Sequence, residues 1–273
     1  MNYVLQRILG RTAVVVGSLS FALMYSMPST AQESEAETGD SSFLVVGAGV
    51  LPEFEGSDDF RPVPFVVSRF FLAGTEIEID GLQVRADFMK DSIWRAGFAM
   101  SVGIPRTDSV GSAAVAALPK VDLAAEFGGF VGFKTAFGSA KEGTLSGFVS
   151  VRQDVTGAHG GLLATPELEY FFAASRMLRF GLAANATYAS NNYMDTYFSI
   201  DAEGSLASGL AEYQAGGGLK DVGAELYSIL SFSPKWGVFS RVTYNRLMND
   251  AADSPVIESR NQYFFGGGLF YRF

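Results

Sequence analysis

The residue best suited to acid–base chemistry is His159, the single histidine in the chain. It lies in the glycine-rich stretch 156–161, where it could act as a base for a nucleophilic serine. The Gly-x-Ser-x-Gly turn that presents such a serine in many hydrolases is absent from the sequence. We therefore expect His159 to be a solvated loop residue and keep a barrel hydrolase only as the third functional hypothesis.

Metal binding would have to rely on carboxylates, because the chain has one histidine and no cysteine. Carboxylates gather in two stretches, with Glu53, Glu55, Asp58 and Asp59 in the first and Asp250 and Asp253 in the second. Neither stretch has the spacing of a calcium-binding loop. The run 216–220 (GGGLK) lacks the spacing of a phosphate-binding loop, and its glycines are better explained by tight backbone turns. The sequence thus predicts no cofactor, no metal site and no enzyme activity.

Charged residues also recur at alternate positions within apolar segments. Successive side chains of an extended strand point to opposite faces, so these charges would share one face and line the lumen of a closed barrel. The candidate lumen charges are Arg85, Asp87, Arg95, Asp122, Glu126, Lys134, Arg152, Glu167, Glu169, Arg179, Glu225 and Arg241. Because both signs are interspersed, the pattern predicts a salt-bridged, largely filled interior or a narrow polar pore, without ion selectivity.

The segments that carry these charges alternate with a period of two residues. In 178–188, Leu178, Phe180 and Leu182 fall on one face, whereas Arg179 and Asn185 fall on the other. A helix would need apolar residues three and four positions apart, and segments of about ten residues suit tilted membrane strands. The pattern predicts an all-β fold, a transmembrane antiparallel β-barrel.

We expect twelve strands, an even number as in bacterial single-chain barrels. Ten is the alternative count, since 74–79 is short for a spanning strand. The Asp80-Gly81 pair predicts a tight hairpin after it. With both termini in the periplasm, the short turns are periplasmic, and the long extracellular loops are 52–60, 105–120, 190–221 and 249–260. The expected strands are 42–51, 61–70, 74–79, 82–89, 93–104, 121–137, 144–155, 162–173, 177–189, 222–232, 236–248 and 261–273.

The carboxy-terminal strand is aromatic along one face and ends on Phe273. Its odd positions include Tyr263, Phe265, Tyr271 and Phe273, and this is typical of the closing strand of an outer-membrane barrel. We expect Tyr271 and Phe273 to form the signal that the barrel-assembly machinery reads.

The amino terminus has the pattern of a secretory signal peptide. Arg7 and Arg11 precede the apolar stretch 12–24, which is too short to span a bilayer, and small residues end at Ala31. We expect cleavage near Ala31, an acidic flexible leader over 32–41, and a barrel over 42–273. The formal charge of −9 argues against nucleic-acid binding, which needs basic surface, so the predicted surroundings are outer-membrane lipid.

Five stretches together resemble the MipA/OmpV family of outer-membrane proteins. They are 47–59 (GAGVLPEFEGSDD), 193–198 (YMDTYF), 215–223 (AGGGLKDVG), 244–255 (YNRLMNDAADSP) and 271–273 (YRF). The resemblance implies a barrel in the outer membrane of a Gram-negative bacterium. It also implies a scaffold that links a lytic transglycosylase and a murein synthase to that membrane. Other family members are described as adhesins or possible channels, so an adhesin or a narrow channel for small solutes is the alternative.

Overall fold

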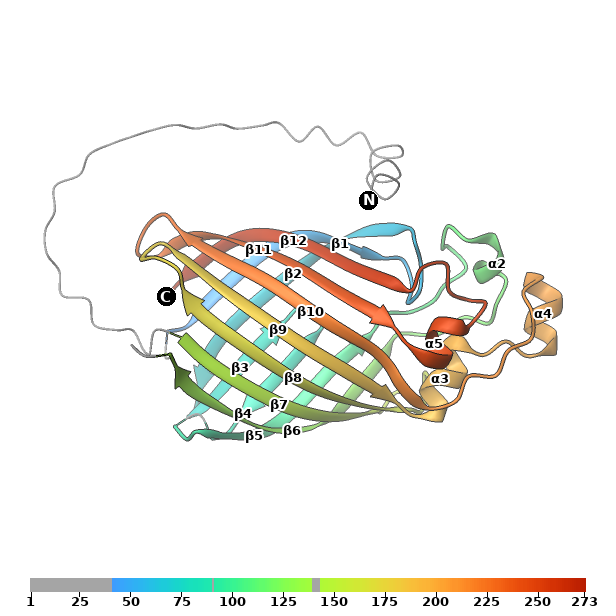
Figure 1. The fold of residues 1–273 in the computed structure, drawn as a ribbon, viewed down its shortest axis with the longest axis horizontal. Helices are drawn as coiled ribbons and strands as arrows, with labels where there is room; N and C mark the ends of the chain where they lie inside the picture. The colour runs from blue at the N-terminus through green and yellow to red at the C-terminus, as the bar shows by residue number, and fades with distance from the viewer. Residues whose placement is uncertain (1–40, 90, 139–142) are drawn as a thin grey trace, which may run out of the picture. The chain divides into compact units, whose positions relative to one another are not determined.

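The computed structural model describes residues 41–89, 91–138 and 143–273, and these form a closed barrel of antiparallel strands (Figure 1). Around the ring the strands follow the chain order, and the last strand pairs with the first. The predicted signal peptide and residues 32–40 of the predicted leader lie outside the described residues. Among the described residues, no helix is long and apolar enough to cross a membrane.

Twelve strands make up the barrel, so the expected fold class is confirmed and the alternative count of ten is wrong. The short segment is a true strand, because it pairs with a neighbour on each side. The strands are β1 (Phe43–Pro52), β2 (Phe60–Leu72), β3 (Thr75–Asp80), β4 (Gln83–Asp87), β5 (Trp94–Gly103), β6 (Ala124–Phe137), β7 (Gly143–Asp154), β8 (Leu162–Ala173), β9 (Leu178–Ala189), β10 (Gly218–Ser231), β11 (Trp236–Leu247) and β12 (Asn261–Arg272).

Two strand boundaries differ from the expected ones by several residues. β10 begins at Gly218 rather than at 222, because Gly218 and Leu219 already pair with β9 before a bulge. β6 begins at Ala124 rather than at 121, because Val121 forms only an isolated bridge to Arg106.

Side chains alternate between lipid and lumen as the sequence pattern predicts. In β12, Phe265 and Leu269 are exposed, as is Phe273 directly after it, whereas Phe270 is buried in the lumen. The β1–β12 register, with Val45 opposite Phe270, closes the ring. The aromatic face of the carboxy-terminal strand therefore faces outward.

Inside the barrel, the walls from β8 through β12 to β2 carry an apolar cluster, here called the inner aromatic cluster. Its members are Val45, Phe65, Val67, Ile229, Phe239 and Phe270, with Phe43, Phe171, Tyr227 and Phe264 packed against them. The sequence analysis did not predict this cluster, because lumen positions were expected to be polar.

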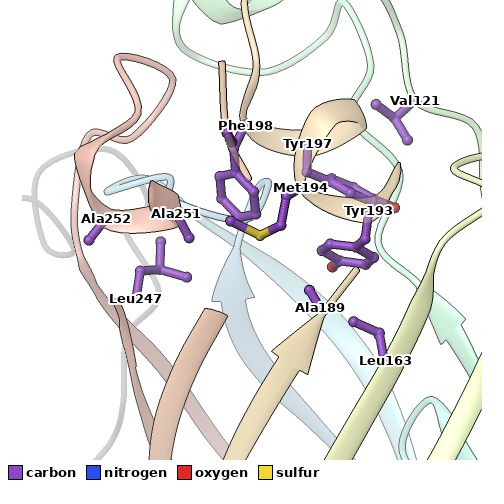
Figure 2. Packing of buried hydrophobic residues seen from close by; sticks show 11 residues of the cluster. Val121, Leu163, Ala189, Tyr193, Met194, Tyr197, Phe198, Leu247, Ala251 and Ala252 are labelled. Carbon is purple, nitrogen blue, oxygen red and sulfur yellow. The ribbon is translucent and has the colours of Figure 1, made fainter. Parts of the chain in front are cut away.

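The long connections carry the helices, all at one end of the barrel (Figure 1). These helices are α2 (Ala113–Ala116), α3 (Asn191–Phe198), α4 (Ala202–Ser208) and α5 (Asn249–Asp253). They pack into a folded cap rather than forming the plain loops expected from the sequence. Figure 2 shows Met194 and Phe198 of α3 close to Leu247 at the end of β11 and to Ala251 of α5, while Tyr193 of α3 lies close to Ala189 at the end of β9.

Candidate functional site: the barrel interior and its cap

Ion pairs cross the lumen from one wall to another. Arg241 on β11 donates from Nη2 to Oδ2 of Asp80 at 2.9 Å, and β12, β1 and β2 lie between β11 and β3 around the ring. Arg85 on β4 lies 3.4 Å from Glu167 on β8, again with three strands between. Because the two strands of each pair are far apart around the ring, their side chains can meet only inside the lumen. Each ion pair therefore crosses the path that a solute would take along the barrel axis.

The carboxylate of Glu76 is buried in this network, with its side chain only 5 % exposed. Its oxygens lie 3.0 Å from Nε of Arg69, 3.3 Å from Nη1 of Arg95 and 3.8 Å from Nζ of Lys134. Arg95 also pairs with Asp87 at 2.9 Å. Burying a charge is costly unless it is paired, so these opposite charges stabilise one another in place.

Eleven of the twelve candidate lumen charges lie on inward-facing strand positions, and Asp122 does not. Asp122 precedes β6 and is exposed in the loop, because the strand starts three residues later than the alternation suggested. The inward ones are Arg85, Asp87, Arg95, Glu126, Lys134, Arg152, Glu167, Glu169, Arg179, Glu225 and Arg241. Among them, Glu225 lies 3.2 Å from Arg241 and Glu169 accepts a hydrogen bond from Tyr227.

Besides the twelve candidates, the network contains Glu76 and Glu78, which share the inward face that alternation predicts for β3, and two residues that the sequence analysis did not identify. Arg69 follows Phe65 and Val67 on the inward face of β2, so the alternation could have identified it. Asp80 was assigned to the hairpin turn, but it is the last residue of β3 and its side chain faces inward toward Arg241. No local sequence signal indicates that distant partner.

His159 is buried beneath the cap, so its expected position in solvent is wrong. Its ring lies 4.8 Å from the ring of Tyr193 and 5.8 Å from that of Tyr197, measured between centroids. The amide of Gly161 donates to Nδ1 at 3.0 Å, so the ring proton is on Nε2, which lies 3.4 Å from Glu126. Within the described residues, neither ring nitrogen is hydrogen-bonded to a serine hydroxyl, and Ser101 donates to Glu126 instead.

The glycine-rich stretch around His159 is held by one carboxylate. Asp154 accepts from the amides of Thr156, His159 and Gly160, each at 2.8 Å. Gly161 then passes so close to α3 that an added Cβ would lie 2.5 Å from the amide nitrogen of Tyr193. These glycines therefore serve the docking of α3 onto the barrel.

A second buried polar group joins two loops and a strand of the cap. Glu55 forms an ion pair with Lys220 and accepts from the hydroxyl of Tyr193 at 2.8 Å. Lys220 also lies 2.8 Å from Asp221. Burial, followed by the nearby Glu55 carboxylate, raises the pKa of Tyr193 well above its usual value, so the hydroxyl remains a neutral donor.

Arg106 fastens the β5–β6 connection to the same cap without using a carboxylate. It donates to the carbonyls of Tyr197, Pro119 and Thr196 at 2.8, 3.2 and 3.3 Å. Burial lowers the pKa of Arg106 from its usual value, because desolvation disfavours the charged form.

The carboxylates considered as metal ligands tie loops together. Glu53 accepts from the amide of Gly111 at 2.6 Å, and Asp250 accepts from the amide of Gly216 at 2.8 Å. No group of three or more potential ligands that could hold a metal ion occurs within residues 41–89, 91–138 and 143–273.

Gly217 also approaches α3 closely, since an added Cβ would lie 2.8 Å from the amide nitrogen of Asn191. Close approach, rather than a positive φ, thus explains this glycine.

Four of the five stretches noted in the sequence analysis meet in the cap. Glu55, Tyr193, Lys220 and Ala251 come from 47–59, 193–198, 215–223 and 244–255, and they form its polar and apolar contacts. The family model for MltA-interacting protein MipA matches residues 44–273. The chain belongs to the MipA family. The suspected relationship is confirmed, and the outer membrane of a Gram-negative bacterium is its location.

Two relatives and one solved structure give the range of similarity. Outer membrane protein OmpV of Vibrio cholerae is 31 % identical over 91 residues, which cover 33 % of this chain and 34 % of OmpV. Omp26La of Vibrio anguillarum is 33 % identical over 92 residues, which cover 33 % of this chain and 34 % of Omp26La. The match therefore spans about a third of either relative. An outer-membrane channel from Pseudomonas putida F1 has a TM-score of 0.44 and 10 % identity, covering 90 % of this chain and 100 % of that one.

Proposed function

We propose that this protein is a non-enzymatic, non-conducting anchor in the outer membrane that binds cell-wall enzymes from the periplasmic side. The observation that carries the non-conducting part is the set of ion pairs that cross the lumen, above all Arg241–Asp80 and Arg85–Glu167. The inner aromatic cluster obstructs the lumen further, and α3 with α5 covers its outer end.

The candidate partners follow from the family. The family model is described as MltA-interacting protein, which favours a lytic transglycosylase as the first partner and a murein synthase as the second. Such partners must contact the periplasmic end, where the described turns are short. Arg176 on the β8–β9 turn and Lys235 on the β10–β11 turn are exposed there and offer basic contacts.

Conductance in planar bilayers tests the non-conducting part. We expect no steady current from the protein as it stands, whereas the double variant Arg85→Ala with Arg241→Ala removes two lumen-crossing side chains and should raise the current. A stable open-channel current from the unmodified protein would overturn this part and favour the narrow channel for small solutes.

Capture of a purified lytic transglycosylase from the same bacterium tests the anchor. The variant Arg176→Ser with Lys235→Ser should reduce capture several-fold, whereas Lys120→Ser with Arg246→Ser, on the cap side, should not. Loss of capture in the second pair alone would contradict periplasmic binding. It would favour a binding role for the outer cap, as in an adhesin.

A further inference from the structure

The barrel wall is incomplete beside the extracellular half of β2. β3 pairs with β2 only from Val67 to Leu72, whereas β1 pairs with β2 as far as Phe60. The last contact on the open side is a hydrogen bond from the amide of Gly81 to the carbonyl of Val66, at 2.9 Å. Beyond it, residues 60–65 have no strand partner on that side within the described chain. On the other side β4 covers β5 almost to its end, since the amide of Val102 donates to the carbonyl of Leu82 at 2.9 Å and β5 ends at Gly103.

Two prolines make this edge a stable feature of the wall. The carbonyl of Val66 points to the open side, and residues two apart along a strand direct their backbone groups to the same side. Pro64 and Pro62 therefore face the opening, and neither has an N–H to leave unsatisfied in lipid. Proline is found on edge strands for this reason, and such an edge is a poor template for an added β-strand.

The opening is bounded on all sides, and we call it the lateral window. Its lower border is the β3–β4 hairpin tip at Gly81 and Leu82, and its sides are β2 and the connection that begins after Gly103 at the end of β5. Above it, the amide of Gly111 donates to Glu53 at 2.6 Å and so joins the two flanking loops. The lateral window lies between the mid-height hairpin and the extracellular loops, which places it at the outer leaflet.

A polar cavity of about 90 Å³ lies behind the hairpin tip. Its lining includes exposed Gln83 at the tip, and deeper in the lumen Arg85, Arg152, Thr165 and Glu167. The hydroxyl of Thr165 is buried and has no hydrogen-bond partner among the described residues. A cavity of this size has room for several waters or for one phosphate group.

Beside the lateral window, β2 also carries an arginine whose buried Nε has no hydrogen-bond acceptor among the described residues. Arg61 is on the inward-facing side of β2, and no described residue accepts a hydrogen bond from its Nε. The outward-facing side chains around the lateral window are apolar, with Val66 at 37 %, Leu82 at 48 % and Met100 at 47 % exposed. Apolar groups outside, with an arginine and a polar cavity inside, suit an amphiphile that carries a negative charge.

We propose that the lateral window admits the phosphate head of an outer-membrane lipid into this cavity while its acyl chains remain in the bilayer. Arg61 meets the phosphate at the opening, and Arg152 and the Thr165 hydroxyl meet it inside. This lipid site is independent of the periplasmic anchor role, and it needs no axial passage through the lumen.

Thiol labelling by a lipid tests the entry of the head group. The chain has no cysteine, so Thr165→Cys provides a unique thiol in the cavity. The full barrel is reconstituted in phosphatidylcholine vesicles that contain a phosphatidylethanolamine with a maleimide on its head. We expect Thr165→Cys to become lipid-linked by mass spectrometry. Ser146→Cys, which is also inward-facing and 5 % exposed but nearer the opposite end, should not react.

Competition then tests the recognition of phosphate. Phosphatidic acid should slow the labelling several-fold, and this protection should fall in Arg61→Gln but not in the matched control Arg246→Gln, whose arginine is exposed away from the lateral window. Equal protection by inorganic phosphate would show a site for the free ion and overturn the lipid assignment.

The labelling result itself can also reject the proposal. Failure of folded Thr165→Cys to react, while the unfolded protein reacts fully, would overturn it, and so would equal labelling of Ser146→Cys. If Thr165→Cys does not fold, Ala99→Cys, which lines the same cavity, replaces it under the same criteria.

Discussion

At the residue scale, the interior depends on charges that are paired at a distance along the chain. Glu76 illustrates this, because Arg69, Arg95 and Lys134 come from three different strands. Three cations share the Glu76 carboxylate, so removing its negative charge leaves all three with a weaker electrostatic partner. A surface pair such as Arg260–Asp253 has no such dependence, since its side chains are 53 % and 63 % exposed.

Replacing Glu76 by glutamine should therefore destabilise the barrel markedly. Breaking a buried ion pair by removing one partner costs about 3–5 kcal/mol. The control Asp253→Asn removes an exposed partner and should cost less than about 1 kcal/mol. Urea unfolding in lipid vesicles, followed by the gel migration of folded and unfolded protein, measures both. Similar midpoints for the two variants would contradict the central place of Glu76.

At the element scale, strands and cap obey different rules. Strand faces follow alternation, so Leu226 faces lipid and is 45 % exposed, while Glu225 faces the lumen. The cap elements are short and depend on docking, as Gly161 shows by its close approach to Tyr193.

Leu226→Arg places a charge in lipid and should cost roughly 2–4 kcal/mol near the midplane. Asn185→Arg points into the lumen beside the polar cavity and should cost less. Gly223 is a poor choice for this comparison, because an added Cβ would clash with the side chains of Asn185 and Asn245. Folding titrations in vesicles compare the two variants. Equal losses would mean that the faces are assigned wrongly.

Gly161→Ala should weaken the docking of α3, because the added Cβ meets backbone rather than a flexible side chain. The expected loss is about 1–3 kcal/mol, as for overpacking of a tight core. Gly218→Ala is the matched control, since it has open space around it and no positive φ. Protease sensitivity of the cap and the unfolding midpoint report the difference. An equally sensitive cap in both variants would contradict the packing argument.

At the scale of the whole molecule, closure joins the first and last strands, and Phe273 lies at this seam. Its amide donates to the carbonyl of Ser42 at 3.1 Å, while its side chain is 67 % exposed. The Phe273 side chain thus contributes little packing to the finished barrel, and we expect it to act during barrel assembly.

Deletion of Phe273 should sharply lower the amount of folded barrel in cells, measured by heat-modifiable gel migration. Refolding of the purified variant in detergent should change little, because the exposed side chain stabilises the barrel only weakly. Unchanged folded yield in cells would refute the assembly signal, and an equal loss in both settings would indicate a structural role instead.

The strands, their faces and the family could be predicted from the sequence alone. These features depend on alternation and on short-range turn chemistry such as Asp80-Gly81, which are visible locally. The early start predicted for β6, and with it the place of Asp122, failed because alternation continues past the point where backbone pairing stops.

Which residues contact one another across the barrel depends on the tertiary structure. It buried His159 beneath α3, paired Arg241 with Asp80 across the lumen and gathered inward-facing phenylalanines into the inner aromatic cluster. It also left β2 unpartnered above the β3–β4 hairpin. The reason is geometric: closing the ring sets strands far apart in sequence face to face, and no local pattern specifies those distances.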